Sequence, residues 1–247
     1  MQRTLVDFLA AARKILVFTG AGVSTGSGIP DFRGPNGISK TRTPVYFDEF
    51  LASEEKRVEY WAGKLEAHAL FRDARPNAAH RAIAALERAG RVEAVVTQNI
   101  DGLHQAGGSS EAMVIEVHGT VRWIECTSCE ARSEPEAAMA AFQADRRPPR
   151  CACGGFLKSA TISFGQQLRP DVLSAAFGAA ARCDLVLALG STLGVHPAAS
   201  IPLAAARRGV PYVIINRGET EHDAICTLRL EGDVAEILPP AVAALAS

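Results

Sequence analysis

The residues best suited to chemistry begin with a glycine-rich string near the start of the chain. An apolar run from Ile15 to Phe18 leads into Gly20-Ala21-Gly22, and the string continues to Asp31-Phe32-Arg33. An apolar run that ends in glycine is typical of a buried strand before a tight turn. Bare glycine lets backbone N–H groups approach a diphosphate, and a helix start favours negative charge. The sequence therefore predicts a strand, a nucleotide-binding turn and a helix start.

The glycine spacing differs from that of the dehydrogenase fingerprint. Gly-x-Gly-x-x-Gly would need glycine at Thr25, and the acidic residue expected about 20 positions further on is missing. Asp31-Phe32-Arg33 instead puts an acid, an aromatic ring and a base beside the expected phosphates. Such a loop suits chemistry on the nucleotide itself. For the Gly-x-Gly turn alone, a plain strand-to-helix connection remains an alternative.

Two further clusters follow predicted strands. Gln98-Asn99-Ile100-Asp101 comes directly after the run 93–97, and its amides and carboxylate could bind a ribose or a carboxamide. A polar turn capped by Asn and Asp would explain the same residues. His118 follows the run 114–117, and an imidazole suits general-base work at neutral pH. A lone histidine is usually structural, but this position favours a catalytic role, whereas His104 has weaker support.

Four of the six cysteines have metal-ligand spacing. A Cys-x₂-Cys pair and a Cys-x-Cys pair are formed by Cys126, Cys129, Cys151 and Cys153. Four thiolates can hold Zn²⁺ tetrahedrally, and such a closed set leaves no open position for catalysis. The spacing predicts one structural zinc ion, with four ordinary thiols as the alternative. Cys183 and Cys226 are expected to be small buried hydrophobic residues.

Predicted strands and helices alternate along the chain, which indicates a doubly wound parallel α/β sheet. The runs 184–190 and 212–216 are the clearest buried strands, and a further strand is predicted over 161–164. One or two helices are expected over 45–74, whereas 126–157 has little hydrophobic periodicity. Polar or glycine clusters follow several strands, and open α/β sheets bind ligands at that edge.

Composition excludes several classes of function. The chain has 247 residues, 48% of them hydrophobic, and a formal net charge of −1. That length suits one α/β domain with an insertion or two small domains. The near-zero charge gives no support for a nucleic-acid partner, and no apolar run approaches the ~20 residues of a membrane span. The start of the chain has no signal-peptide pattern, so a cytoplasmic location is expected.

Taken together, these motifs resemble the sirtuin family of NAD-dependent protein-lysine deacylases. The resemblance covers nearly the whole chain and includes the glycine-rich string, the segment 97–104, His118-Gly119, the four cysteines, Phe164-Gly165, Gly190-Ser191-Thr192 and Gly232-Asp233-Val234. It implies a Rossmann-like doubly wound parallel sheet with a smaller lobe made of a helical insertion and a structural zinc module. The implied large domain is discontinuous, over 1–39, 76–120 and 161–247, and the small lobe combines the helical insertion 40–75 with the zinc module 121–160.

The resemblance also implies that NAD is a reactant rather than a hydride carrier. Asn99 and Asp101 join His118 in the implied catalytic set, with Asp101 binding the nicotinamide carboxamide. Phe32 would cover the ribose after nicotinamide leaves, and Arg33 would order the cofactor loop. The residues implied to bind NAD are Gly20, Ala21, Gly22, Ile29, Asp31, Phe32, Arg33, Gln98, Asn99, Ile100, Asp101, Gly190, Ser191, Thr192, Asn216, Asp233 and Val234.

The implied reaction transfers an acyl group from lysine to ADP-ribose. His118 would deprotonate a ribose hydroxyl, and the products would be free lysine, nicotinamide and O-acyl-ADP-ribose. The acylated-lysine protein or peptide would bind as an extended strand to a monomeric enzyme. The residues implied to contact it are His118, Ile162, Phe164, Gly165, Gly194 and Val195.

Some positions depart from the family pattern. Gln166 stands where glutamate is common, and Trp61 and Lys64 stand where desuccinylating members have tyrosine and arginine. We therefore expect deacetylation and only weak desuccinylation. The main alternative function is mono-ADP-ribosyl transfer to protein from the same NAD site, which the intact His118 disfavours. A dehydrogenase and a non-enzymatic zinc-ribbon adaptor that binds nucleotide fit less well.

Overall fold

A computed structural model describes residues 3–31 and 43–245 of the chain. Its larger sheet has six parallel strands in the order β3-β2-β1-β7-β8-β9. The order reverses between β1 and β7, and doubly wound sheets bind their ligands at this switch point. The strands are Ile15–Thr19 (β1), Val92–Thr97 (β2), Val114–Glu116 (β3), Leu185–Leu189 (β7), Tyr212–Asn216 (β8) and Leu228–Glu231 (β9).

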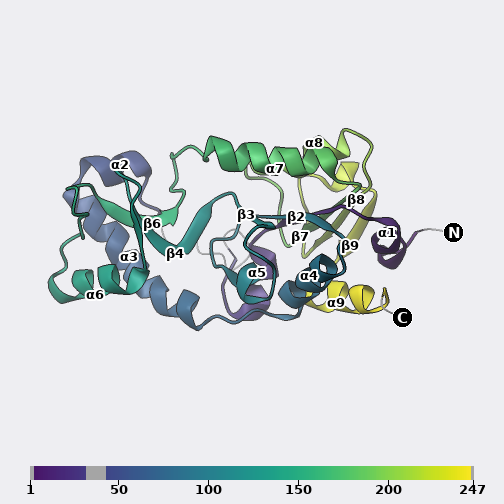
Figure 1. The fold of residues 1–247 in the computed structure, drawn as a ribbon, viewed down its shortest axis with the longest axis horizontal. Helices are drawn as coiled ribbons and strands as arrows, with labels where there is room; N and C mark the ends of the chain where they lie inside the picture. The colour runs from purple at the N-terminus through teal and green to yellow at the C-terminus, as the bar shows by residue number, and fades with distance from the viewer. Residues whose placement is uncertain (1–2, 32–42, 246–247) are drawn as a thin grey trace.

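Helices cover both faces of this sheet, because the central strands are apolar on both sides. Val17 and its neighbours on one face pack against α1, α4 and α9, and Phe18 on the other face packs against α7 and α8. Figure 1 shows α7 and α8 above the sheet and α4 and α9 below it. The helices are Leu5–Ala11 (α1), Ala78–Arg88 (α4), Pro170–Arg182 (α7), Ser200–Ala206 (α8) and Val234–Ala243 (α9).

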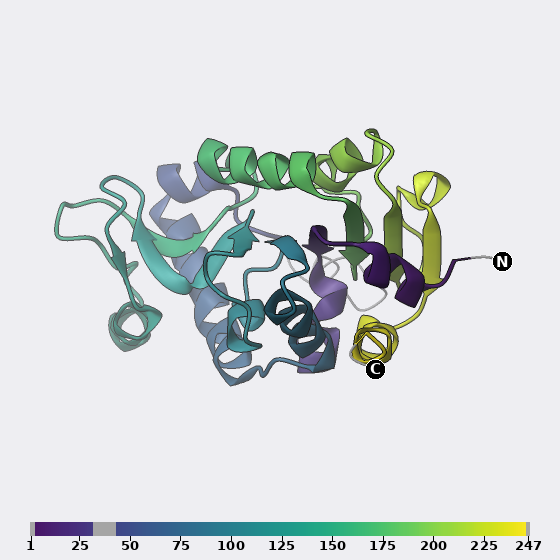
Figure 2. The ribbon, with the colours of Figure 1, turned by 45° about the vertical axis from the view of Figure 1, so that its right-hand side comes forward.

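The smaller lobe is built on a three-stranded antiparallel sheet in the order β5-β4-β6. It lies at the opposite end of the molecule from the chain termini, at the left of Figure 1, and Figure 2 shows the same separation after a turn. Trp61, Ile124 and Phe142 form its core. The elements are Phe47–Ala52 (α2), Glu54–Asp73 (α3), Gly119–Cys126 (β4), Arg132–Ser133 (β5), Pro135–Asp145 (α6) and Leu157–Thr161 (β6).

The doubly wound parallel sheet with a smaller lobe is confirmed, as are helices within 45–74, but two local predictions are wrong. The glycine-rich turn leads into two 3₁₀ turns, Ala21–Val23 (η1) and Thr25–Ser27 (η2), rather than an α-helix. Frequent glycine explains this, because each glycine in a helix interior costs about 1 kcal/mol. The strand expected over 161–164 is β6, which ends at Thr161.

Helix α6 lies inside 126–157, the segment with little hydrophobic periodicity, for which no helix was predicted. It begins with a proline at its first position, which suits the fixed φ of that residue. It buries Ala138, Met139 and Phe142 against the small lobe. Its sequence contains five alanines around few large apolar residues, so its helical periodicity is weak. Within the described ranges, no helix is long and apolar enough to cross a membrane.

Candidate active site and metal centre

Two glycine turns meet at the switch point of the large sheet. The backbone N–H of Gly20 donates to the Leu189 carbonyl at 3.0 Å, and that of Gly22 donates to the Gly190 carbonyl at 2.8 Å. A Cβ atom on Gly190 would lie 2.4 Å from the Val23 nitrogen, and the φ of Gly190 is +58°. Only glycine fits there, because a side chain would push the two turns apart. The result is a side-chain-free surface, formed by residues predicted to bind the diphosphate.

The polar segment after β2 ties this surface together. The Gln98 side-chain amide donates to the Ser191 hydroxyl at 2.8 Å, and the Gln98 backbone N–H donates to the Thr19 carbonyl at 2.9 Å. The ends of β1, β2 and β7 are thereby joined by direct hydrogen bonds. The structure thus brings together Gly20, Gln98, Gly190 and Ser191, which the sequence analysis had placed in one site.

Asp101 and Asn99 are organised by a residue that the sequence analysis missed. The Ser24 hydroxyl donates to Asp101 Oδ2 at 2.6 Å and accepts from Asn99 Nδ2 at 3.1 Å. Asn99 Nδ2 also donates to the Gly20 carbonyl at 3.1 Å. Burial raises the pKa of Asp101, and the Ser24 bond opposes that shift. The sequence feature that could have pointed to Ser24 is its hydroxyl side chain, two residues after Gly22 in the glycine-rich string.

The alternative role of Asp101 as a turn residue is also present. Its Oδ1 atom accepts from the Leu103 backbone N–H at 2.9 Å, at the start of the short helix Leu103–Ala106 (α5). Gly102 between them has a φ of +71°. A capping carboxylate is held in a fixed orientation, so capping and ligand binding are compatible in one side chain.

His118 lies in the link between β3 and β4, and one ring nitrogen is anchored. Its Nδ1 atom is 2.9 Å from the Gln98 carbonyl, which can only accept, so Nδ1 carries the proton. The other nitrogen, Nε2, is then unprotonated and able to act as a base. Burial lowers the pKa of His118, while the bond to Gln98 opposes this shift. The ring is therefore neutral at pH 7, as general-base chemistry requires.

A second buried network lies beneath the same segment. His104 Nε2 is 2.9 Å from the Thr19 hydroxyl, which donates to the Thr97 hydroxyl at 2.8 Å. The Thr97 hydroxyl in turn accepts from the Asn99 backbone N–H at 3.0 Å. The His80 ring packs edge-on against His104 with ring centroids 5.0 Å apart. His104, to which the sequence analysis gave little weight, therefore contributes to the support of Asn99.

The residues predicted to contact an acylated peptide follow two different strands. The Ile162 N–H donates to the His118 carbonyl at 2.8 Å, just after β6. Phe164 is 42% exposed, and Gly165 beside it has a φ of +79°. Gly194 and Val195 are half-buried in the loop after β7. The first segment thus joins the predicted base to an exposed aromatic side chain.

The remaining predicted NAD contacts are spread around the same edge of the sheet. Asn216 ends β8 and donates from Nδ2 to the Arg217 and Gly218 carbonyls, and Asp233 caps α9 through the Ala235 N–H. Ile29 is buried, Asp31 is half-buried and Thr192 is exposed. Phe32 and Arg33 lie outside the described residues. Ala21 is the first residue of η1, and Val234 is the first residue of α9. The Ile100 carbonyl accepts from the Val121 N–H.

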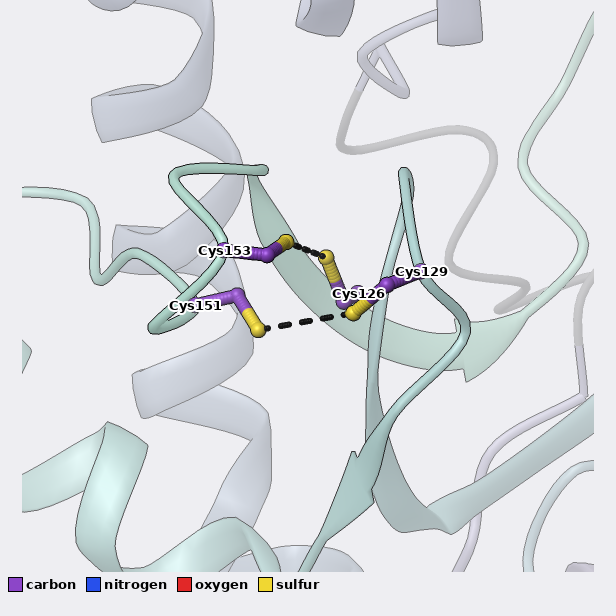
Figure 3. A group of neighbouring side chains, drawn as sticks. All are labelled: Cys126, Cys129, Cys151 and Cys153. Carbon is purple, nitrogen blue, oxygen red and sulfur yellow. Dashed lines mark hydrogen bonds between the residues drawn. The ribbon is translucent and has the colours of Figure 1, made fainter.

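The four predicted metal ligands converge in the small lobe. Figure 3 shows Cys126 facing Cys153 and Cys129 facing Cys151, with sulfur separations of 3.5 and 3.7 Å. All four sulfur atoms lie within 4.8 Å of one another. Tetrahedral zinc with Zn–S bonds of about 2.3 Å needs sulfur separations of about 3.8 Å. The donor set therefore fits zinc.

Backbone groups support this cluster. The N–H groups of Cys129 and Ser128 lower the pKa of the Cys126 thiol to about 6, which favours the thiolate that a metal requires. A Cβ atom on Gly155 would lie 2.6 Å from Cys126 Sγ, so glycine is needed at that point of the second knuckle. Outside the cysteine cluster, Cys183 is buried in the apolar core on the α7 and α8 face of the large sheet, and Cys226 packs partly buried against that core.

A cavity of about 390 Å³ is lined by Asp101 and by residues of α3, β4 and α6 in the small lobe. Lys64 on α3 lines it, together with His68 and Phe71 on the same helix face. Trp61 does not line it, because this side chain is fully buried and its Nε1 donates to the Leu157 carbonyl at 3.1 Å. Of the two positions compared with the desuccinylating sirtuins, only Lys64 therefore reaches the cavity.

The fold and the site together define a nucleotide-binding α/β protein with a neutral, anchored histidine and a separate four-cysteine metal centre. Comparison with known proteins gives the family. The model of the Sir2 family matches residues 20–197, and the chain belongs to that family. The sirtuin resemblance inferred from the sequence is thereby confirmed.

Curated relatives match along almost their whole length. A protein named NAD-dependent protein deacetylase 1 from Bradyrhizobium diazoefficiens is 44% identical over 96% of this chain and 94% of its own. The NAD-dependent protein deacetylase of Thermotoga maritima is 41% identical over 95% of this chain and 94% of its own.

Solved structures agree with the sequence relatives. A Sir2 complex with a p53 peptide and NAD⁺ superposes with a TM-score of 0.86 at 38% identity, covering 97% of this chain and 96% of its own. A Sir2 mutant with deacetylated p53 peptide and 3′-O-acetyl ADP ribose has a TM-score of 0.85 at 39% identity, with 94% of each chain covered.

Proposed function

We propose that the protein is an NAD-dependent protein-lysine deacetylase, which converts NAD and acyl-lysine into nicotinamide, lysine and O-acyl-ADP-ribose. The curated relatives carry this activity in their names, and solved relatives hold NAD, peptide and acetylated ADP-ribose. One observation in this chain carries the proposal. His118 is neutral and anchored through Nδ1, and its Nε2 has no hydrogen-bond partner among the described residues. The Asn99–Ser24–Asp101 cluster lies at the same nucleotide edge of the sheet.

In this proposal, His118 Nε2 accepts the proton of a ribose hydroxyl. The hydroxyl then attacks the carbon of the acyl group, whose oxygen has already displaced nicotinamide from the ribose. The bond between this carbon and the lysine nitrogen then breaks, and water adds to the carbon to give O-acyl-ADP-ribose. The anchored Nδ1–H keeps the ring oriented as Nε2 becomes protonated, and the Gln98 carbonyl stabilises the resulting imidazolium. Burial keeps competing water away from the reacting carbon.

The nucleotide is bound in two parts. The glycine turns at Gly20–Gly22 and Gly190 let the diphosphate approach the backbone closely, because no side chain intervenes. Asp101 and Asn99, held by Ser24, form the nicotinamide pocket. Asn216 and the start of α9 lie further along the same edge and take the adenosine end.

The acyl-lysine substrate lies between the segment that follows β6 and the loop that follows β7. Exposed Phe164 and the loop around Gly194 and Val195 form the two sides. Zinc, held by the four cysteines, is structural, since no fifth protein ligand or open position is needed. Acetyl is the preferred acyl group; comparable turnover of succinyl-lysine would contradict this part of the proposal. Monomeric state, absence of nucleic-acid partners and cytoplasmic location stay predictions from the sequence.

The large sheet with its helices is the NAD-binding domain in this proposal, and the small lobe combines the two insertions of the chain. The division follows the two sheets and their separate cores. His118 lies on the segment that links β3 of the large sheet to β4 of the small sheet, whereas Asn99 and Asp101 follow β2 in the large unit.

The test is mass spectrometry of NAD and an acetyl-lysine peptide with the native enzyme and with His118→Ala. The native enzyme should release deacetylated peptide, nicotinamide and O-acetyl-ADP-ribose in equal amounts. Loss of a general base should lower the rate by at least about 10²-fold. His222→Ala is the control for loss of another imidazole, because the His222 ring bonds to Tyr212 and to no member of the predicted catalytic set.

Two outcomes would overturn the proposal. If the peptide kept its acetyl group while label from NAD became attached to protein, ADP-ribosyl transfer would be the function. If His118→Ala, folded and able to bind NAD, were as active as the native enzyme, His118 would not be the base.

A further inference from the structure

A buried lysine stands directly beneath the segment that would hold the substrate. Lys158 lies in β6 and is only 4% exposed. Its ammonium donates to the Ser159 carbonyl at 3.1 Å, to the Thr161 carbonyl, and to Gln166 Oε1 at 3.5 Å. The ammonium group thus has three acceptors, which are two backbone carbonyls and one side-chain amide oxygen. Among the described residues, none of these acceptors is a carboxylate.

A buried charge is costly unless it is fully hydrogen-bonded, so this arrangement needs an explanation. Burial lowers the pKa of Lys158, and the nearby cations Lys64 and Arg169 act in the same direction. The negative charges of Tyr60 and Glu125 oppose this shift in the pKa of Lys158. The reaction proposed above uses none of these groups. Lys158 must therefore contribute through the backbone that it binds.

Gln166 links the ammonium to the turn that carries Phe164. Its Oε1 atom accepts from the Ser163 N–H at 3.1 Å as well as from Lys158. The Gln166 N–H donates to the Ser163 carbonyl at 3.0 Å, which closes a four-residue turn. Gly165 supplies the positive φ that this turn needs at its third position. The amide oxygen therefore reinforces the turn through the Ser163 N–H and anchors it to β6 through Lys158.

The same segment reaches the predicted base at one end and the start of α2 at the other. Directly after Thr161, whose carbonyl binds Lys158, the Ile162 N–H donates to the His118 carbonyl at 2.8 Å. At the far end, the Phe164 carbonyl accepts from the Phe47 N–H at 2.9 Å. The Lys158 ammonium also lies 5.9 Å from the centre of the Phe47 ring.

We propose that Lys158 and Gln166 are a pair of positioning residues for the acyl-lysine substrate, which fix the course of residues 161–166 against His118 without touching the reacting atoms. The inference rests on the proposed deacetylase function. A neutral glutamine suits this role, because its oxygen can accept from an ammonium and a backbone N–H together. The pair sets the affinity for the peptide and leaves the NAD site, on the other strands, unaffected.

The test compares KM for an acetyl-lysine peptide with KM for NAD in Gln166→Leu, Gln166→Glu and Lys158→Met. Losing a hydrogen bond to a charged group should raise the peptide KM about tenfold in Gln166→Leu and Lys158→Met, with the NAD KM unchanged. Gln166→Glu keeps both acceptor contacts and should stay close to the native values. A variant that combines Lys158→Met with Gln166→Leu should have the same peptide KM as Lys158→Met alone, because the two residues act as one unit.

Matched controls are available in the same chain. Gln167→Leu changes the neighbouring, exposed glutamine, and Lys56→Met removes an exposed lysine that pairs with Glu59. Both should behave as the native enzyme. If Lys158→Met does not fold, the contrast between Gln166→Leu and Gln166→Glu carries the test.

A peptide KM that stayed at the native value in folded Gln166→Leu, or a rise of both KM values together, would overturn the inference. A lower melting temperature alone would mark the pair as merely structural. If the native enzyme showed no deacetylation, the proposed function would fail separately. Binding of a fluorescent acetyl-lysine peptide by the same variants would then decide the positioning role.

Discussion

The large sheet unit and the small lobe are stabilised by different means. The large unit has two extensive apolar clusters, one on each face of its sheet. Among the described residues, the small-lobe cluster has five buried hydrophobic residues, and its sheet includes the two-residue strand β5. A lobe with so small a core needs a further source of stability, and four converging thiolates can supply it through a metal. A small sequence insertion can thus fold beside a large domain.

Metal removal should separate the two regions most strongly. The protein should contain one zinc ion per chain, and Cys151→Ser should lose it, because structural zinc contributes on the order of 10 kcal/mol. Hydrogen exchange should then rise in α3, α6 and β4, while β1, β7 and β8 remain protected. Cys226→Ser, outside the cluster, is the control. Equal loss of protection in both regions would contradict the comparison.

Core truncation should give a smaller effect with the same regional contrast. Trp61→Ala should destabilise the small lobe by about 3–5 kcal/mol and speed the release of zinc to a chelator. Ile83→Ala, on the buried face of α4 in the large unit, should cost about 2–5 kcal/mol and leave zinc release unchanged. Denaturation and chelator kinetics measure the two effects. Faster zinc release in Ile83→Ala would show that the cores are one unit.

Acidification should act chiefly on the large unit. Burial lowers the pKa of His80 to about 4 and that of His104 to about 3, below the ordinary 6.5. A histidine whose pKa is lower in the folded than in the unfolded protein stabilises the fold, and this contribution is complete above the unfolded pKa of 6.5. The contribution is lost as the pH falls from 6.5 towards the pKa of the folded state. Each should cost about 2 kcal/mol at about pH 5.

Urea denaturation at about pH 7.5 and about pH 5 measures this loss. His104→Asn should show a smaller difference between the two pH values than the native protein, whereas His68→Asn, in the small lobe, should match the native difference. Acidification has the opposite effect on the contribution of Asp101 and Glu116 to stability, because burial raises the pKa values of these carboxyl groups. An unchanged difference in His104→Asn would contradict the assignment.

The sequence by itself determined the large-unit strands, the metal ligands and the polar edge. Apolar runs such as Tyr212–Asn216 form the strands as predicted, because a strand buried on both faces needs little beyond local composition. The four cysteines converge as their spacing indicated, because thiolate ligands in two short knuckles can meet at one metal. Gln98 and Ser191 meet because the carboxyl ends of parallel strands share one edge.

Only the tertiary structure decided the supporting contacts. Helix α6 has a weak pattern of its own and is fixed by packing against Trp61. Strand β6 ends at Thr161 because the chain there turns to bind His118 and Lys158, which no local pattern records. Ser24, His104 and Lys158 carry ordinary polar side chains, and each acquires its role from partners that lie far away in the sequence or across a turn. Hydrogen bonds of this kind depend on positions in space, which spacing along the chain does not specify.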